Sequence, residues 1–512
     1  MQKHPERHFN YQLIIESILV GALASLGAVG YRFLLTYASD LSVWMYSQRH
    51  ALAIVASLVF LIAAAKLTAW LLSYAPYSGG SGIPQVMGEF SGLMKMRSLR
   101  IIVSKYLGGL LSMIAGMSLG REGPSIQIGA AMGKWTSKKL GEDLTRERLL
   151  ITAGAAAGLA AAFNAPIAAT LFVLEEVHKN IGTQILLPAF IASLTSDYLS
   201  KLAFGMTPSF HIEVVNVLPS NQYLHLIGLG ILCALVGWAF VSGLLGFQTL
   251  AKKYLPKMEL RVLVGFVIAG VVGYFLTILT GSGHDLVETL LESPASLNFL
   301  LALLLGKLIF TCLSYDSGVP GGIFLPVLVL GSLTGMIYFQ LVQALGMDVT
   351  AFWQNFVIFG MTGILTAVVR SPITSILLVS EMTGSLSHIL SISIVAAVAY
   401  LLMEWLDIEP IYESLYERMF DRVKPSALDL DKVTLQYVIP SYSDLVGKKI
   451  KEMDLPADTL IVSMKRGQED IIPTGQVTLL GMDKIMVLCN LSSVGQVRDY
   501  FRQLGEETVP DR

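Results

Sequence analysis

Two glutamates, Glu122 and Glu176, adjoin long apolar stretches in a part of the chain that carries few charges. Glu122 belongs to the motif Gly-Arg-Glu-Gly-Pro at 120–124, and Glu176 follows the apolar run 149–174. A carboxylate inside a membrane is costly and indicates function by default. Burial favours its protonated form, whereas nearby helix N-termini favour its charged form. We therefore expect Glu122 to alternate between the two forms, occupying an anion site when charged and leaving it when protonated.

Three motifs rich in glycine and proline stand where apolar runs begin: 79–84 (GGSGIP), 120–124 (GREGP) and 320–326 (PGGIFLP). Glycine lets the backbone approach a ligand closely, and proline suits the first turn of a helix. A helix start presents free N–H groups and a partial charge of about +0.5. Three such starts converging near the membrane centre would form an anion site without a full cation.

Two hydroxyl groups fit the same hypothesis. Ser81 lies in the first motif, and Tyr412 follows Glu409-Pro410 where the apolar part of the chain ends. A bare lysine or arginine would hold an anion too tightly for release, whereas partial charges and hydroxyl groups bind weakly enough for turnover. Ser81 and Tyr412 are therefore candidate donors to a transported anion.

Membrane helices must position these residues. Hydrophobic residues make up 54% of the 512, charged residues only 14%, and the mean hydropathy is +0.62. A spanning helix needs about 20 mostly apolar residues. Breaks at glycine and proline are tolerated only where protein or a water-filled site satisfies the backbone. Suitable runs cover 13–38, 51–74, 101–119, 149–174, 184–200, 224–250, 262–284, 296–313, 322–345, 354–369 and 385–403.

Charge density indicates a domain boundary near residue 420, because residues 1–420 are about 11% charged and residues 421–512 about 28%. Basic residues gather at 95–105 and 251–261, which should face the cytoplasm, whereas 205–226 has no Lys or Arg and should face outward. The sequence thus predicts a multi-pass protein with both termini in the cytoplasm.

An internal repeat predicts two halves, about 12–204 and 222–420, that run in opposite directions. Residues 161–176 resemble 367–382, and Gly-x-x-Gly at 120–123 has a counterpart at 318–321. Met382 occupies the place that matches Glu176, so Glu176 is the extra acid. The aligned pairs are Pro166 with Pro372, Ile167 with Ile373, Leu171 with Leu377 and Glu175 with Glu381.

The segments GSGIP at 80–84, GREGP at 120–124 and GIFLP at 322–326, together with Tyr412, resemble the CLC family of chloride channels and transporters over residues 10–420. The resemblance implies an all-α polytopic fold built as an inverted repeat with broken helices. It also implies a homodimer in the lipid bilayer with one ion pathway per subunit.

The same resemblance implies which groups hold chloride. Ser81, Tyr412 and the backbone amides of Ile323 and Phe324 would form a central site. Backbone amides around Arg121, Glu122 and Gly123 would form an outer site.

The family pattern assigns the external gate to Glu122 and internal proton transfer to Glu176. Having both acids favours a chloride/proton antiporter over a passive channel, which remains the alternative. A fluoride/proton exporter is a further alternative, although that branch departs from the serine and proline kept here as Ser81 and Pro124.

Structural roles compete with these assignments. Glu122 could pair with Arg121 or Lys105, and Glu176 could be a solvated acid at a helix end. Tyr412 could be an interfacial tyrosine, as we expect for Tyr416 one turn later. We interpret Glu175 and Glu381 as structural acids that cap helices or form pairs.

Residues 433–505 predict a small cytoplasmic α/β domain. Strands are expected at 459–464 and 484–491, with turns at Arg466-Gly467 and Thr474-Gly475. The stretch 444–488 resembles the RCK-C or TrkA-C regulatory domain. That resemblance implies dimerisation, a bacterial inner-membrane protein, and a small regulatory ligand such as a cyclic dinucleotide; a dimer module without a ligand is the alternative.

Other function classes lack sequence support. The net charge of −2 does not suggest nucleic acid, and the three cysteines are too scattered for a metal site or disulfide framework. We find no nucleophile–base pattern and no phosphate loop, so we expect neither an enzyme nor an organic cofactor in the membrane domain.

Overall fold

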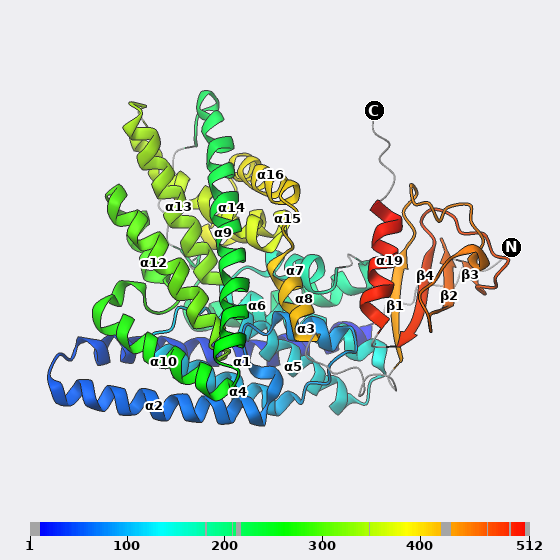
Figure 1. Cartoon of the computed structure of the whole chain (residues 1–512), viewed down its shortest axis with the longest axis horizontal. Helices are drawn as coiled ribbons and strands as arrows, with labels where there is room; N and C mark the ends of the chain where they lie inside the picture. The colour runs from blue at the N-terminus through cyan, green and yellow to red at the C-terminus, as the bar shows by residue number, and fades with distance from the viewer. Residues whose placement is uncertain are drawn as a thin grey trace. The chain divides into compact units, whose positions relative to one another are not determined.

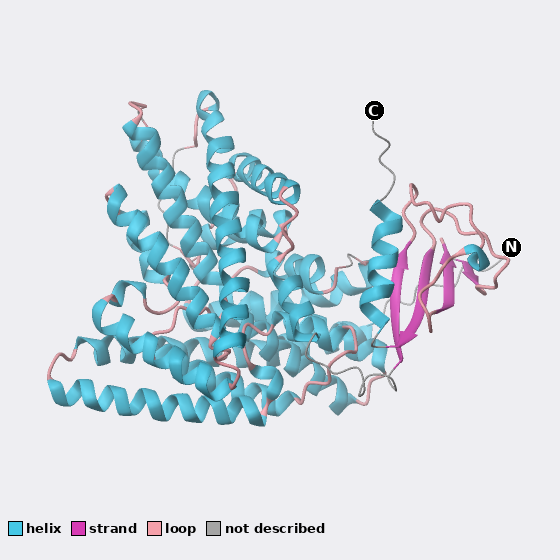
Figure 2. Ribbon diagram, in the orientation of Figure 1, coloured by secondary structure: helices cyan, strands magenta, loops and turns pink. Residues whose placement is uncertain are grey.

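The computed structural model describes residues 11–179, 182–206, 208–210, 217–347, 349–420, 432–467, 469–490 and 493–506. The chain divides into a membrane unit, residues 1–90 with 95–415, and a tail unit, residues 91–94 with 416–512. The membrane unit is helical, whereas the tail unit contains the sheet drawn in magenta in Figure 2. The N-terminal residues 1–10, on which the cytoplasmic N-terminus was predicted, lie outside the described residues.

The membrane unit contains two successive sets of helices, α1–α8 and α9–α16, in which corresponding helices follow in the same order (Figure 1). The first set contains α1 (Tyr11–Ser47), α2 (Ala51–Tyr74), α3 (Ile83–Phe90), α4 (Ser98–Ile114), α5 (Glu122–Leu140), α6 (Leu144–Phe163), α7 (Pro166–Phe172) and α8 (Thr183–Phe204). The second contains α9 (Leu224–Tyr254), α10 (Met258–Phe275), α11 (His284–Glu292), α12 (Leu297–Asp316), α13 (Phe324–Ala344), α14 (Trp353–Val369), α15 (Pro372–Thr383) and α16 (Ile389–Trp405). Helix α17 (Ile411–Phe420) follows the second set.

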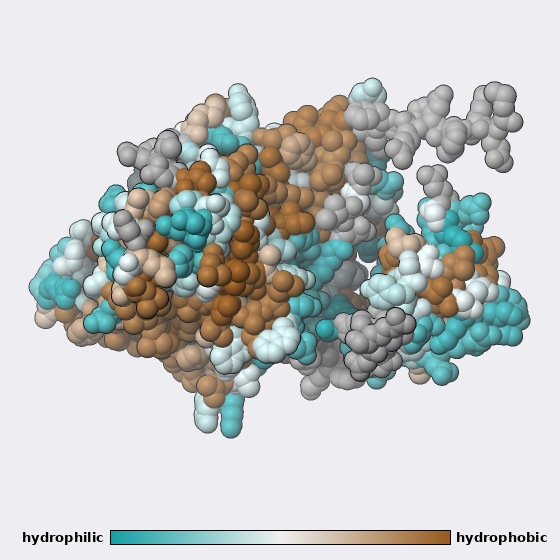
Figure 3. Space-filling view, turned by 90° about the horizontal axis from the view of Figure 1, so that it is seen from above, coloured by the Kyte–Doolittle hydropathy of each residue, from teal (hydrophilic) through white to brown (hydrophobic). Residues whose placement is uncertain are grey.

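Seven helical segments among the described residues are long and apolar enough to cross a membrane, which confirms the predicted polytopic helical fold. They are α1, α2, α9, α10, α12, α13 and the segment 350–369. The most apolar stretch of α13 is 83% buried, against 28% for α2, so α13 belongs to the core and α2 presents its side chains outward. Hydrophobic residues cover much of the visible face of this unit in Figure 3, as lipid contact requires.

Small residues bring the core helices into backbone contact. Gly129 of α5 lies against Gly154 of α6, and in the second half Gly331 of α13 lies against Gly360 of α14, so a side chain at any of these glycines would overlap backbone atoms. Membrane helices pack through such close approaches because lipid supplies no hydrophobic drive for association.

Several of the predicted apolar runs are broken, and two show how. The run 149–174 is interrupted at Asn164, which adopts the left-handed conformation at φ 56° and separates α6 from α7. The run 262–284 ends as an α-helix at Phe275 and continues through the 3₁₀ turn η4 (Thr277–Leu279). Helix α5 begins at the motif 120–124, as predicted, although no run long enough to span the membrane was predicted there; its Lys134 is buried and pairs with Glu89, whereas Lys138 and Lys139 are exposed near its end.

The two halves cap each other's helices. The Glu381 carboxylate accepts from the N–H groups of Ile167 (3.2 Å) and Ala168 (2.8 Å) at the start of α7. The Glu175 carboxylate accepts from the N–H (3.1 Å) and hydroxyl (2.6 Å) of Thr374 at the start of α15. This confirms the structural role predicted for both acids, and exchange of caps between equivalent positions is what a two-fold relation between halves produces.

The structure corrects the register of the glycine motifs. Gly120 pairs across an antiparallel bridge with Gly322, and α5 begins two residues after Gly120 as α13 begins two residues after Gly322. Gly120 is therefore equivalent to Gly322, and the predicted alignment of 120–123 with 318–321 is wrong. Glycine spacing alone misled the alignment because the loop before α13 contains several glycines.

The tail unit is a four-stranded antiparallel sheet in the order β1-β4-β2-β3. The predicted strands are present as β2 (Leu460–Arg466) and β4 (Lys484–Asn490), while β1 (Lys432–Val438) and β3 (Glu469–Ile471) were not predicted. Residues 425–431 and Leu491 lie outside the described residues. Helix α19 (Val494–Glu506) contributes Val497 and Phe501 to a core that includes Ile461, Ile485 and Val487.

Candidate ion-binding site

The three glycine-rich motifs meet through backbone hydrogen bonds. The N–H of Gly80 donates to the carbonyl of Val319 (3.0 Å), and the N–H of Gly321 donates back to Gly80 (3.1 Å). Gly120 and Gly322 exchange N–H···O bonds, that from Gly322 at 2.8 Å. The loop before α13 is therefore bonded to the loops before α3 and α5, and three helix starts converge.

Glycine is required where these loops touch. A Cβ at Gly123 would lie 2.6 Å from the Ser81 carbonyl oxygen. Gly80 and Gly82 adopt φ values of 63° and 99°, which a side chain would strain. The motif glycines thus allow both the turn around Ser81 and its contact with the start of α5.

The predicted central residues lie in one connected, buried cluster. Ser81 is fully buried, and its Oγ accepts from the Ile83 N–H at 3.1 Å, which leaves the hydroxyl proton available as a donor. Ile323 and Phe324 are buried where α13 begins. Tyr412, in the first turn of α17, is fully buried, and its hydroxyl has no hydrogen-bond partner among the described residues.

Aromatic contacts connect Tyr412 with the start of α13. The ring of Phe172 lies 6.3 Å from that of Tyr412 and 5.5 Å from that of Phe324, measured between centroids. On the other side, the hydroxyl of Tyr315 interacts with Ser81 and lies within electrostatic range of Tyr412. The interfacial alternative for Tyr412 is therefore wrong. The same expectation for Tyr416 is also wrong, because Tyr416 is 6% exposed and its hydroxyl lies 2.9 Å from Ser91 Oγ.

Glu122 is fully buried at the start of α5. Its carboxylate lies against Gly120, where a side chain would overlap it, and close to the start of α13 at Leu325. Neither carboxylate oxygen has a hydrogen-bond partner among the described residues. A buried acid that is held by no close hydrogen bond and is set among helix starts is a group that can exchange both its proton and its position.

The competing ion pairs for Glu122 are weak or absent from the described contacts. Arg121 Nε lies 4.0 Å from the carboxylate, at the limit of an ion pair. Lys105 is fully buried and donates instead to the carbonyl of Gly80 at 2.7 Å, so it holds the loop that carries Ser81.

Glu176 lies on η2 (Val173–Val177), a π-helical turn that continues α7. Its side chain is 3% exposed, which contradicts the interpretation as a solvated acid. One carboxylate oxygen accepts from Ser371 Oγ at 3.1 Å, and the other has no partner among the described residues. Both Glu122 and Glu176 act electrostatically on the Tyr412 hydroxyl.

Sequence reasoning missed Tyr315 and Phe172. Tyr315 stands three residues before the glycines that precede α13, at the polar end of an apolar run, and this position was the available signal. Phe172 had no signal, because an aromatic residue in an apolar run is most simply a packing residue.

Comparison with known proteins agrees with this geometry. The voltage gated chloride channel family matches residues 63–404, more than half of the chain, and the TrkA-C domain family matches residues 435–502. The H⁺/Cl⁻ exchange transporter ClcA of Salmonella paratyphi B is 32% identical over 419 residues, which cover 79% of this chain and 88% of that protein. The ClcA of Vibrio cholerae serotype O1 is 32% identical over 438 residues, which cover 82% and 92%.

A solved structure has the same fold. A slow cyanobacterial Cl⁻/H⁺ antiporter superposes with a TM-score of 0.76 at 28% identity, covering 80% of this chain and 98% of that one. The extent of these matches confirms the resemblance identified from the sequence motifs. The chain belongs to the voltage-gated chloride channel (CLC) family and carries a C-terminal TrkA-C domain.

Proposed function

We propose that this protein is a secondary active transporter that exchanges chloride for protons across the bacterial inner membrane. The observation that carries the proposal is Glu122, a fully buried carboxylate without hydrogen-bond partners at the junction of three helix starts. Relatives with related sequences are H⁺/Cl⁻ exchangers by name.

Chloride binds in the central cluster through partial charges. Ser81 and Tyr412 donate their hydroxyl protons, and the backbone N–H groups of Ile323 and Phe324 donate from the start of α13. The backbone amides of residues 121–123 form a second, outer chloride site. Because no bare cation of the described cluster faces the anion, binding is weak enough for release.

Glu122 acts as the external gate. A charged carboxylate and chloride compete for the same helix N-termini, because both are anions of similar size. Protonation removes the charge of Glu122, and chloride then displaces the side chain. Each opening of the gate therefore requires a proton on Glu122, and this requirement couples the flow of chloride to the flow of protons.

Glu176 transfers protons on the internal side. Its buried position, single bond to Ser371 and electrostatic proximity to Tyr412 support this role. Lys179 and Glu413, which form an ion pair at 2.7 Å, adjoin it electrostatically and are partly exposed, so protons can reach Glu176 from water nearby.

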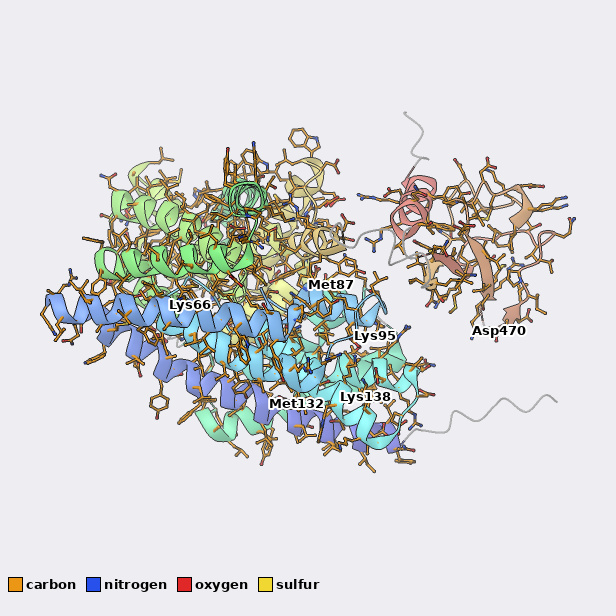
Figure 4. All side chains as sticks on the ribbon, turned by 60° about the horizontal axis from the view of Figure 1, so that its bottom comes forward. Lys66, Met87, Lys95, Met132, Lys138 and Asp470 are labelled. Atoms are coloured by element: carbon orange, nitrogen blue, oxygen red, sulfur yellow. The ribbon has the colours of Figure 1, made fainter. Side chains whose placement is uncertain are left out.

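Both termini face the cytoplasm in this proposal, and the protein is a homodimer. Figure 4 labels Lys95 and Lys138 toward the same end of the membrane unit, which supports a cytoplasmic location for that end under the positive-inside rule. The TrkA-C domain regulates transport by binding a small ligand. Deleting residues 425–512 should therefore leave chloride flux intact while altering its regulation.

Simultaneous chloride and proton fluxes in reconstituted liposomes test the proposal. An imposed chloride gradient should drive protons uphill. Chloride flux without proton movement would establish the passive channel instead, with reversal potentials at the chloride Nernst value. Fluoride flux in preference to chloride, with bromide and nitrate excluded, would establish the fluoride exporter.

A further inference from the structure

The loop around Ser81 has a counterpart in the second half of the membrane unit. Residues 280–283 read Thr-Gly-Ser-Gly, and residues 79–82 read Gly-Gly-Ser-Gly. Each loop follows a 3₁₀ turn, η1 (Pro76–Ser78) or η4, and precedes a short helix, α3 or α11. The backbone angles agree: φ is 63° and 99° at Gly80 and Gly82, and 66° and 86° at Gly281 and Gly283.

A buried lysine holds each loop in the same way. Lys105 of α4 donates to the carbonyl of Gly80 at 2.7 Å. Lys307 of α12 donates to the carbonyl of Gly281 at 2.9 Å and to that of Leu279 at 3.0 Å. Both lysines are fully buried, so each loop is held by an amine that solvent does not reach.

The second loop faces a cavity of about 400 Å³ rather than the central cluster. Ser282, Thr280 and Gly281 line it together with Arg121 and Ser42. Ser42 is 4% exposed, and its hydroxyl has no hydrogen-bond partner among the described residues, as is true of Arg121 Nε. The Ser42 hydroxyl is therefore a buried donor without a protein acceptor beside the serine loop, and together with the Arg121 guanidinium, whose Nε lies 4.0 Å from Glu122, it indicates a bound acceptor.

The acids of the cavity lie at its exposed part. Asp40 and Asp285 line it but are exposed to solvent, where their charges are screened. His284 also lines it, stacks on Phe210 and lies 3.3 Å from Glu288. The less exposed polar groups of the lining are Arg121 and hydroxyls, so the interior favours an anion, while the outer carboxylates disfavour a multivalent one.

We propose that this cavity is a loading site for a small monovalent inorganic anion, held between Ser282, Ser42 and Arg121 before it passes Glu122. Arg121 adjoins both the cavity and the gating glutamate, so an anion there lies one residue from the gate. The identity of the anion as chloride rests on the proposed function, whereas the site itself rests on the duplicated loop, the unpartnered Ser42 hydroxyl and the charge of Arg121.

Anomalous diffraction from crystals of the full chain grown in bromide tests the site. We expect a bromide peak in the cavity in addition to one near Ser81. Ser282→Asp places a carboxylate in the cavity and should remove the first peak while keeping the second. Ser42→Ala removes a hydroxyl that bonds nothing in the described structure, so the fold should tolerate it, and the cavity peak should weaken.

Transport gives a second readout. Chloride is varied on the side of the liposome membrane from which it enters the cavity before it reaches Glu122. Under this condition Ser282→Asp should raise the half-saturating chloride concentration several-fold with little change in maximal rate. Ser47→Asp adds the same charge at the exposed end of α1 and should leave both values unchanged.

The inference is overturned if bromide fills the Ser81 site but not the cavity, or if both variants leave the cavity peak and the half-saturating concentration unchanged. Failure of the proposed function gives a different result, namely absence of the peak near Ser81 or of chloride flux in the wild type.

Discussion

Acids that occur at equivalent positions in both halves of the membrane unit differ in their contacts from acids that occur in only one half. Glu175 and Glu381 occupy equivalent positions, and each caps a helix of the other half. Glu122 and Glu176 have no acidic counterparts, because Phe324 and Met382 stand at the equivalent positions. An acid that recurs in both halves maintains the contact between them. An acid that occurs once breaks the symmetry, and it caps no helix of the other half with the paired hydrogen bonds that Glu175 and Glu381 make.

The largest effect should come from removing the charge of Glu122. Glu122→Gln cannot release a proton, so proton flux should fall by at least about 100-fold while chloride continues to pass. A pH-sensitive dye and a chloride electrode, used on the same liposomes, measure the two fluxes. Retained uphill proton movement in this variant would show that the gate lies elsewhere.

Glu176→Gln should also uncouple the protein, with a loss of proton flux of at least about tenfold. The matched control is Glu175→Gln, the same chemical change one residue earlier in a capping position. The ratio of protons to chloride should fall in the first variant only. Equal loss of coupling in both would contradict the distinction between recurring and single acids.

The recurring acids should matter for stability instead. Glu381→Gln and Glu175→Gln each weaken a helix cap, and each should lower the free energy of unfolding by about 1–2 kcal/mol. Thermal unfolding in detergent measures this, with Glu292→Gln as a control because that acid is exposed at the end of α11. Similar losses are expected at Glu381 and Glu175, since the two caps are equivalent; a large difference between them would weaken the two-fold comparison.

Asp483 is an acid of the tail unit, outside the membrane-spanning part of the chain. Asp483 accepts from Arg466 through both carboxylate oxygens (2.9 and 2.8 Å) and from the Leu480 N–H (2.7 Å). Burial raises the pKa of Asp483, but these hydrogen bonds outweigh it and hold the pKa below its ordinary value. The resulting stability is present above the unfolded pKa of about 3.9 and is lost as the pH falls through the lower folded value.

Hydrogen exchange of β4 amides in the full chain tests this smaller effect. After correction for intrinsic exchange, their protection should be constant from about pH 7 to pH 5 and decline below about pH 4. Asp483→Asn should reduce protection at neutral pH by about 1–3 kcal/mol. Unchanged protection in that variant would mean that the pair with Arg466 contributes no net stability.

Much of the fold could be predicted because its signals are local. Long apolar runs predicted the membrane helices, and the charge change near residue 420 predicted a separate tail. Glycine-proline motifs marked the helix starts because those residues suit a tight turn and a first helical turn. The strands β2 and β4 were predicted from apolar segments near turn residues, whereas β1 was not predicted although residues 432–438 alternate between polar and apolar, and the three-residue β3 is too short to give a pattern.

The sequence by itself determined the membrane helices, the three helix starts and the two single acids, because each depends on residues adjacent in the chain. Only the tertiary structure decided that Gly120 pairs with Gly322, that Glu175 and Glu381 exchange caps, and that Tyr315 and Phe172 join the cluster around Ser81 and Tyr412. These contacts join residues far apart in the chain, and local composition carries no information about which distant backbone groups will be hydrogen-bonded. In a membrane every buried backbone group needs a partner, so the packing of the halves, rather than any motif, selects those partners.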